Sequence, residues 1–263
     1  MKISIITVTY NSEKTLEETV KSVISQDYMN IEYIIVDGGS TDGTKAIMEK
    51  YKEYIAISIS EPDNGISDAF NKGIVLATGD IIGIINSDDV LYPHALSKVN
   101  RTFENDPDLD IVYGNTVRFK KNINDGFLYK PDTDLSKMKN AFLLSHPSIF
   151  ITAKAYTSYG VFSCEYKCAM DYELIARMYY AGAKFMYLDA VLSGFREGGE
   201  SLKKFEKTLQ EHEKIATTNG AAPKKIKRYI RKMYVYQMLI SVTQKLHIEK
   251  VLRRILKKQG RPK

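Results

Sequence analysis

The chain has 263 residues, 44% of them hydrophobic, and a formal net charge of +6 at pH 7. This length and composition support a sizeable core, as one domain with an appendage, and exclude a mainly disordered chain. The two cysteines, Cys164 and Cys168, lack a second CxxC pair and a histidine at zinc spacing, so we expect reduced thiols rather than a zinc site or disulfides. No run of 18 apolar residues occurs, so we expect no membrane-spanning helix.

The first hundred residues alternate predicted strands and helices. Residues 1–10 hold an apolar, β-branched run without a small-residue cleavage site, which favours a first strand over a signal peptide. Apolar runs and helical spacing predict strands over 3–8, 31–36, 55–59 and 81–85, with helices over 16–24, 46–51 and 66–74. This alternation indicates an α/β fold with a mainly parallel central sheet and helices on both faces.

Polar, turn-forming residues follow each of the four predicted strands. These segments are 9–11, 37–43, 61–65 and 86–89. Any one of them is typical of an ordinary loop or helix cap. Because ligands bind beyond the carboxyl ends of the strands in such a sheet, the four segments together predict a binding site.

Two adjacent acids, Asp88 and Asp89, come directly after the isoleucine-rich fourth strand. Such a pair is costly to desolvate unless a cation or hydrogen-bond donors neutralise it. The chain has neither GxGxxG in its GGSTDG loop nor a GxxxxGK[ST] motif, which argues against a dinucleotide fold and a P-loop. A divalent cation held by the two carboxylates would neutralise a bound phosphate, and Mg²⁺ or Mn²⁺ prefers such ligands.

The segments SIITVTYN, YIIVDGGSTDGT, PDNGISDAFNKGI and ATGDIIGIINSDD resemble, in order and spacing, those of the family 2 glycosyltransferases. The resemblance implies a GT-A fold over residues 1–205, divided into a nucleotide-sugar-binding half (1–110) and an acceptor-side half (111–205), with a basic helical extension over 206–263. It implies metal-assisted transfer of a sugar, with inversion, from a nucleotide-sugar to an acceptor hydroxyl. A UDP-sugar is the expected donor and Mn²⁺ or Mg²⁺ the expected cofactor.

The resemblance also implies roles for individual residues. The donor-binding residues would be Thr9, Tyr10, Asn11, Asp37, Gly65, Asp68, Lys72 and Asp88. The metal would lie on Asp89 and Asp88, with His146 either a further ligand or a buried structural residue. Lys72 would offset phosphate charge, or else form a surface ion pair with Asp68 one helical turn away.

One residue departs from the family pattern, and one segment has two interpretations. Gly38 departs from the family pattern, because many relatives have a second acid there that contacts the base. Residues 195–201, FREGGES, resemble the mobile loop that closes over bound donor, and their alternative is an ordinary turn.

The segment CAMDYELIARM resembles the acidic motif of the family, with Met170 in place of the first acid. Asp171 is therefore the candidate general base that deprotonates the acceptor hydroxyl, and Glu173 is the weaker alternative. Asp171 also suits a helix cap ahead of an amphipathic run.

The tail over residues 224–263 holds fourteen Lys and Arg and one acid, Glu249. Its apolar residues at helical spacing predict two basic amphipathic helices, from Ile226, Ile230, Met233, Tyr236 and Ile240 and from Ile248, Val251, Leu252, Ile255 and Leu256. Such helices bind anionic bilayers, which suits a lipid-linked acceptor. Alternatively they pack on the domain or on a second subunit. No nucleic-acid recognition motif accompanies the charge, so we expect no nucleic-acid partner.

These patterns lead us to expect a cytoplasmic hexosyltransferase, peripheral on the inner face of the membrane, in surface polysaccharide or lipid-linked glycan assembly. The pathway rests on the resemblance alone. Two alternatives stay open: a nucleotidyltransferase, which would release pyrophosphate, and a non-catalytic nucleotide-sugar-binding protein, which the loss of an acid at Met170 would suit.

Overall fold

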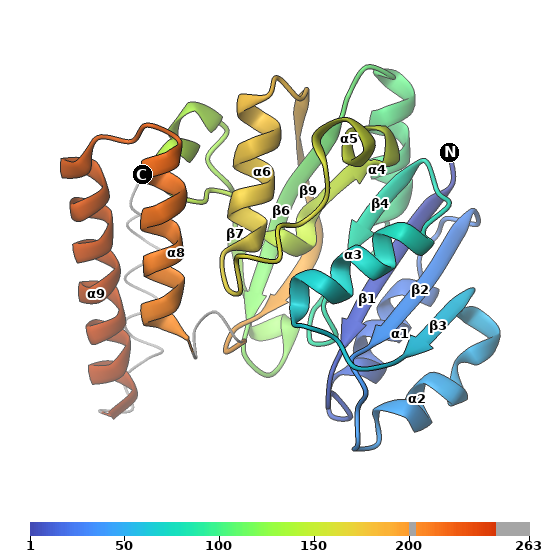
Figure 1. Cartoon of the computed structure of the whole chain (residues 1–263). Coiled ribbons are helices and arrows are strands. Elements are labelled where there is room, and N and C mark those ends of the chain that lie inside the picture. The colour runs from blue at the N-terminus through green and yellow to red at the C-terminus, as the bar shows by residue number, and fades with distance from the viewer. Residues whose placement is uncertain (200–203, 246–263) are drawn as a thin grey trace.

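The strands predicted in the first hundred residues form a parallel group of four within a nine-stranded sheet (Figure 1). The computed structural model describes residues 1–199 and 204–245. In the order β3-β2-β1-β4, the strands are β3 (Ile57–Ser60), β2 (Ile31–Asp37), β1 (Ile3–Thr9) and β4 (Ile81–Ile84). All three pairings are parallel. The carboxyl ends of the four strands therefore lie at one edge of the sheet.

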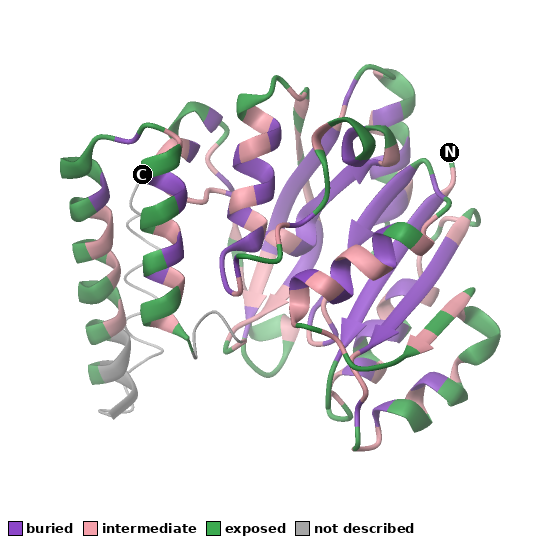
Figure 2. Ribbon diagram, in the orientation of Figure 1, coloured by how far each residue is buried: buried purple, intermediate pink, exposed green. Residues whose placement is uncertain are grey.

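Helices cover both faces of this sheet, as predicted, and alternate residues of each strand enter opposite cores. Ile6 and Val8 of β1 pack with α3, while Ile3 and Ile5 pack with α1 and α4. Every residue of β1 is buried as a result (Figure 2). The helices and short 3₁₀ turn of this half are α1 (Leu16–Ile24), α2 (Thr44–Lys50), η1 (Lys52–Tyr54), α3 (Ile66–Leu76) and α4 (Ala95–Asn105).

The second half extends the sheet through antiparallel pairings. β8 joins β4 to β6, β6 then pairs in parallel with β9, and the short β7 and β5 add to β6 and β9. The strands are β5 (Val90–Leu91), β6 (Ile111–Phe119), β7 (Phe127–Tyr129), β8 (Ile149–Thr152) and β9 (Phe185–Arg196). The helical elements are η2 (Ile123–Asp125), η3 (Leu135–Lys139), η4 (His146–Ser148), α5 (Ala153–Tyr159) and α6 (Met170–Tyr180).

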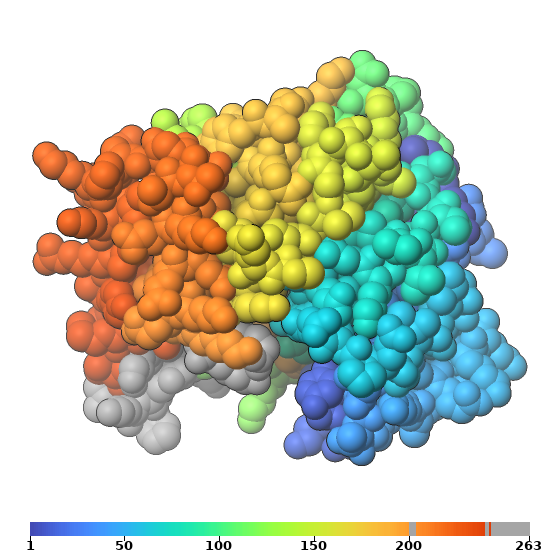
Figure 3. Space-filling model, in the orientation of Figure 1, coloured from blue at the N-terminus to red at the C-terminus, as the bar shows by residue number. Residues whose placement is uncertain are grey.

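A helical hairpin, α8 (Phe205–Thr218) and α9 (Pro223–Lys245), follows the sheet and packs beside α6 (Figures 1 and 3). Ile226 of α9 is buried against Ala216 and Ala221, and exposed residues cover the outer side of α9 (Figure 2). The first helix predicted in the tail corresponds to α9, while the second falls in residues 246–263, outside the described part. Within the described residues, no helix is both long and apolar enough to span a bilayer.

Candidate active site

Asp37 ends β2 and fixes the loop that follows it. Its buried carboxylate accepts hydrogen bonds from the backbone N–H of Ser40 at 3.0 Å, from the Ser40 hydroxyl and from the Ser60 hydroxyl at 2.6 Å. These donors join the ends of β2 and β3. The GGSTDG loop is therefore held against the carboxyl edge of the sheet by the side chain predicted to face the donor.

Residues 9–11 leave β1 at the same edge in an unusual conformation. Thr9 is buried, and within the described residues its hydroxyl has no hydrogen-bond partner. Tyr10 is 63% exposed, and Asn11 has a positive φ of 48°, which is uncommon outside glycine. The side-chain oxygen Oδ1 of Asn11 accepts from the backbone N–H of Thr41 at 2.9 Å, which ties Asn11 to the GGSTDG loop. An exposed ring on a fixed, strained turn is typical of a binding site.

Gly38 lies between Tyr10 and Asp63, which explains its departure from the family pattern. A Cβ at position 38 would lie 2.4 Å from Oδ2 of Asp63 and 3.5 Å from the Tyr10 ring. The other Asp63 oxygen accepts from the backbone N–H of Gly65 at 2.8 Å, so the carboxylate is held in place. An acid from the loop after β3 thus occupies the space that a side chain at position 38 would need.

The loop before α3 brings Gly65, Asp68 and Lys72 together. Gly65 has φ of 112°, and Asp68 accepts from the backbone N–H of Asn64 at 3.0 Å. The Lys72 ammonium lies 2.7 Å from Glu61 and 3.8 Å from Asp68, and the Glu61 carboxylate raises the pKa of Lys72. The ion-pair interpretation of Lys72 therefore describes this structure, with Glu61 as the nearer partner.

The acid pair lies just beyond β4, beside the end of β9. Asp89 is fully buried, and its carboxylate accepts from the backbone N–H of Arg196 at 2.8 Å and from the Asn86 amide at 3.3 Å. Burial, and then the neighbouring charge of Asp88, raise the pKa of Asp89 well above its usual range. The Arg196 guanidinium donates to the backbone carbonyl of Asp88 at 3.0 Å and stacks on Phe119.

This acid pair fits a divalent cation. Two adjacent carboxylates, one of them with a strongly raised pKa, form a site whose negative charge a cation would offset. In the described parts of the chain no three His, Cys, Asp or Glu side chains come together at metal-binding distance. The structure thus does not bring His146 together with the pair. Mg²⁺ and Mn²⁺ sites commonly use one or two carboxylates and complete their shell with substrate phosphates.

The glycine-rich segment after β9 reaches this pair. A Cβ at Gly199 would lie 3.9 Å from Oδ2 of Asp88. The arginine of FREGGES, Arg196, was not predicted as a site residue, although its place in the predicted loop was the available signal. The structure has Phe195 and Arg196 as the end of β9, and Glu200 and Ser201 lie outside the described residues.

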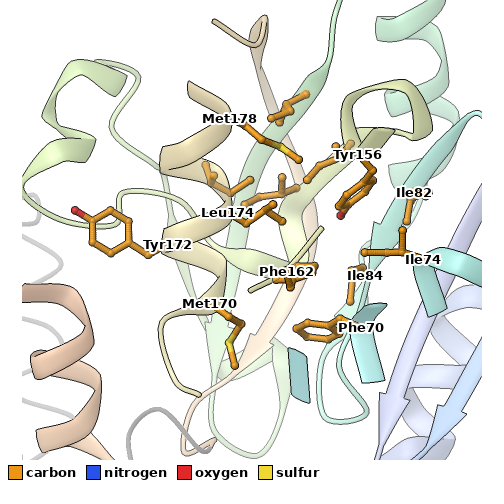
Figure 4. Close-up of a cluster of buried hydrophobic side chains, with 14 of the residues drawn as sticks. Phe70, Ile74, Ile82, Ile84, Tyr156, Phe162, Met170, Tyr172, Leu174 and Met178 are labelled. Carbon is orange, nitrogen blue, oxygen red and sulfur yellow. The ribbon is translucent and has the colours of Figure 1, made fainter. Parts of the chain in front are cut away.

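Asp171 lies in the first turn of α6, with its side chain at a small cavity. The cavity, about 10 Å³ and hence about the size of one water, is also lined by His146, Tyr156, Phe162 and aliphatic side chains of β4, β8 and α6. Figure 4 shows four of these lining residues, Ile84, Tyr156, Phe162 and Leu174, in the buried apolar cluster. Burial raises the pKa of Asp171 to about 6. The N-cap residue of α6 is Ala169 rather than Asp171, but the Asp171 carboxylate accepts from the backbone N–H of Tyr172 at 2.8 Å in the first turn of the helix.

His146 shares that cavity and stacks on Phe70 with ring centroids 5.1 Å apart. Burial lowers its pKa to about 4, so the ring is neutral at pH 7. Its Nε2 is buried and, among the residues described, has no hydrogen-bond partner. The structural interpretation of His146 therefore accounts for its ring, while Nε2 remains available to a water or ligand in the cavity.

The fold is that of the GT-A glycosyltransferases. S. aureus TarS in complex with UDP-GlcNAc superposes with a TM-score of 0.64 at 20% identity, over 88% of this chain and 70% of that one. A Pyrobaculum calidifontis mannosyltransferase with GDP-Man and Mn²⁺ gives 0.65 at 19% identity, over 88% and 68%. The family model "Glycosyl transferase family 2" matches residues 4–168, so the chain belongs to glycosyl transferase family 2.

Two curated relatives are matched over less than half of their own length. An uncharacterised glycosyltransferase of Nostoc sp. is 34% identical over 124 residues, covering 44% of this chain and 38% of that protein. The chondroitin synthase of Escherichia coli is 28% identical over 249 residues, covering 92% and 35%. The chain thus spans less than half the length of these relatives.

Proposed function

We propose that this chain transfers a sugar, with inversion, from a UDP-sugar to the hydroxyl of a glycan or lipid-linked acceptor. The observation that carries the proposal is the buried Asp89 beside Asp88 at the sheet edge that also holds Asp37. Related structures contain UDP-GlcNAc or GDP-Man, which supports a nucleotide-sugar as the ligand of this edge. TarS supports uridine as the base.

In this proposal the polar strand ends hold the donor. Thr9, Tyr10, Asn11 and Asp37 surround the nucleoside, and the loop at Gly65, with Asp68 and Lys72, lies by the diphosphate. Asp88 and Asp89 would hold Mn²⁺ or Mg²⁺, which supplies charge stabilisation for the leaving diphosphate.

The proposed base is Asp171. Its carboxylate removes the proton of the acceptor hydroxyl as that oxygen attacks C1 opposite the departing nucleotide, which inverts the anomeric centre. A pKa of about 6 suits this role, because the group is ionised at pH 7 but more basic than an ordinary carboxylate.

A panel of nucleotide-sugars tests this function. With Mn²⁺ present, one donor should raise the melting temperature by mass action, and with its acceptor it should release free nucleoside diphosphate. Release of pyrophosphate would instead indicate nucleotidyl transfer. Donor binding without either product, across a broad acceptor panel, would indicate a non-catalytic binding protein.

We also propose that the basic tail binds an anionic membrane. The first turns of α9 expose six basic side chains, and later turns expose large apolar ones. The basic residues are Lys224, Lys225, Lys227, Arg228, Arg231 and Lys232; the apolar ones include Tyr234, Val235, Met238 and Val242. Basic and apolar residues together on one helix are typical of interfacial binding.

Vesicle co-sedimentation tests this proposal. Replacing Lys224, Lys225, Lys227 and Arg228 with glutamine should lower binding to phosphatidylglycerol vesicles at least 10-fold, at about 1 kcal/mol per basic residue. The matched control replaces four exposed lysines elsewhere, Lys14, Lys45, Lys98 and Lys154. Equal binding by the two variants would contradict a membrane role for α9.

A further inference from the structure

Glu211, on α8, is buried and binds the backbone just before α6. Its carboxylate accepts three hydrogen bonds from backbone N–H groups: from Lys167 at 2.9 Å, Cys168 at 2.8 Å and Ala169 at 2.9 Å. Only 9% of the residue is exposed. A buried carboxylate with three backbone donors is a specific structural feature, because a buried charge is costly unless it is paired in this way.

These N–H groups lead up to α6, where Asp171 itself accepts from the backbone N–H of Tyr172 at 2.8 Å. The N-cap residue of α6 is Ala169, whose side chain cannot accept a hydrogen bond. Helix N-termini leave backbone N–H groups without partners, and an anion there also interacts favourably with the helix dipole. Glu211 supplies that anion from a helix more than forty residues away in the chain.

A second contact from α8 holds the same turn of α6. The ring of His212, next to Glu211, lies 4.9 Å from the ring of Tyr172 and stacks on that of Tyr229 at 5.9 Å. Tyr172 directly follows Asp171 and is fully buried on the side of α6 opposite Phe70 and Tyr156 (Figure 4). The α8–α9 hairpin therefore contacts the chain on both sides of Asp171 in the sequence, at residues 167–169 just before α6 and at Tyr172 within it.

The bound segment also touches the donor side of the site. The Lys167 ammonium donates to the backbone carbonyl of Asn64 at 3.0 Å, and Ser67 donates to the carbonyl of Tyr166 at 3.1 Å. Figure 3 shows the surface of this segment between α3 and α8. One short stretch, residues 164–169, thus connects the loop before α3, the start of α6 and Glu211.

We propose that Glu211 is a positioning residue for Asp171, acting through the three N–H groups that set where α6 begins. This inference rests on the proposed function, in which Asp171 is the base. The negative charge of Glu211 also adds to the effect of burial in raising the pKa of Asp171. The proposal makes α8 an integral part of the catalytic unit, contrary to the domain boundary expected at residue 205.

The variant Glu211→Gln tests the proposal, because the amide keeps the shape but loses the charge and part of the acceptor capacity. We expect kcat to fall about 10- to 100-fold, the effect of a small misplacement of a reacting group, with the donor KM within about twofold of wild type. The acidic limb of the pH profile of kcat should move to lower pH, because the negative charge of Glu211 near Asp171 is removed. Glu213→Gln, an exposed change on the same helix, is the matched control.

Two further variants keep the test decisive. Glu211→Asp retains the charge, so its acidic limb should stay at the wild-type pH even where its turnover falls. If Glu211→Gln does not fold, the turnover of Glu211→Asp and the pH of its acidic limb test the positioning role instead. In an Asp171→Asn background, Glu211→Gln should lower turnover by less than about twofold, because residues that act as a unit are not additive.

The proposal and the function fail in different ways. A wild-type enzyme that transfers sugar, together with a folded Glu211→Gln variant of unchanged kcat and unshifted limb, overturns the positioning role alone. A multiplicative loss in the double variant overturns it as well. A wild-type protein without transfer in the donor panel overturns the proposed function itself.

Discussion

Asp89→Asn is expected to lower kcat/KM about 10³-fold or more, the range for losing a group that stabilises a charged leaving group. Asparagine has the shape of aspartate, so its carbonyl oxygen still accepts from the Arg196 N–H. The change removes a fully buried charge whose pKa is raised by burial and by Asp88, so the melting temperature should stay level or rise. Nucleoside diphosphate release and thermal unfolding, measured on the same preparation, check both expectations.

The dependence on Mn²⁺ distinguishes the loss of a metal site from a general loss of folding. Mn²⁺ with UDP should raise the melting temperature of the wild-type protein but not that of Asp89→Asn. The control is Asp108→Asn, an exposed acid before the amino end of β6, at the opposite edge of the sheet. More than a tenth of wild-type turnover in Asp89→Asn, or an undiminished Mn²⁺ response, would refute the metal assignment.

The first half of the sheet was predictable because its strands are buried on both faces. Such strands must be apolar along their whole length, and β1, β2 and β4 each fall within one residue of the predicted bounds. β3 was placed two residues too early. Its residues alternate between half-buried and exposed, and the 3₁₀ turn η1 precedes it, so the apolar run there extended beyond the strand.

The second half carries no comparable local signal. β6 pairs with β8 and β9, joining Ile111 to Ile151 and to Phe185. Pairings between segments so far apart leave no period in the sequence that predicts which strands meet. The mixed direction of this half, with β8 antiparallel to both neighbours, follows from those pairings.

The same limit applies to the site. Sequence patterns placed Asp37, Asp88 and Asp89 at one edge, since each directly follows a strand. They gave no sign that Asp63 occupies the space beside Gly38, or that Glu211 binds the backbone N–H groups of residues 167–169 just before α6. An acid at the start of an amphipathic helix predicts a contact with the first-turn N–H groups, as Asp171 makes with Tyr172, but it does not predict which distant acid binds the residues just before the helix.

Asp171→Asn is expected to lower kcat about 10²-fold or more while leaving donor affinity unchanged, because the base acts on the acceptor. Wild-type kcat should fall as pH drops through about 6, where Asp171 becomes protonated, and the variant should lose this limb. The free energy of unfolding should change with pH in the opposite direction to kcat. The folded-state pKa lies above the unfolded value, so the folded protein binds the extra proton between about pH 4 and 6 and loses stability as pH rises through that window. At pH 8 the variant should therefore be more stable than wild type, with the difference shrinking below pH 6.

Glu173 provides the matched control for this prediction, since it was the alternative base on the same helix turn. Its carboxylate pairs with the Arg177 guanidinium at 2.8 Å, an arrangement that holds it as a structural ion pair. Glu173→Gln should keep turnover within about threefold of wild type and retain the acidic limb, because an ion pair of this kind contributes little beyond local stability. Near-normal turnover in Asp171→Asn would remove Asp171 as the general base. Loss of the acidic limb of the kcat pH profile in Glu173→Gln would assign that role to Glu173. Either result would also remove the proposed positioning role of Glu211.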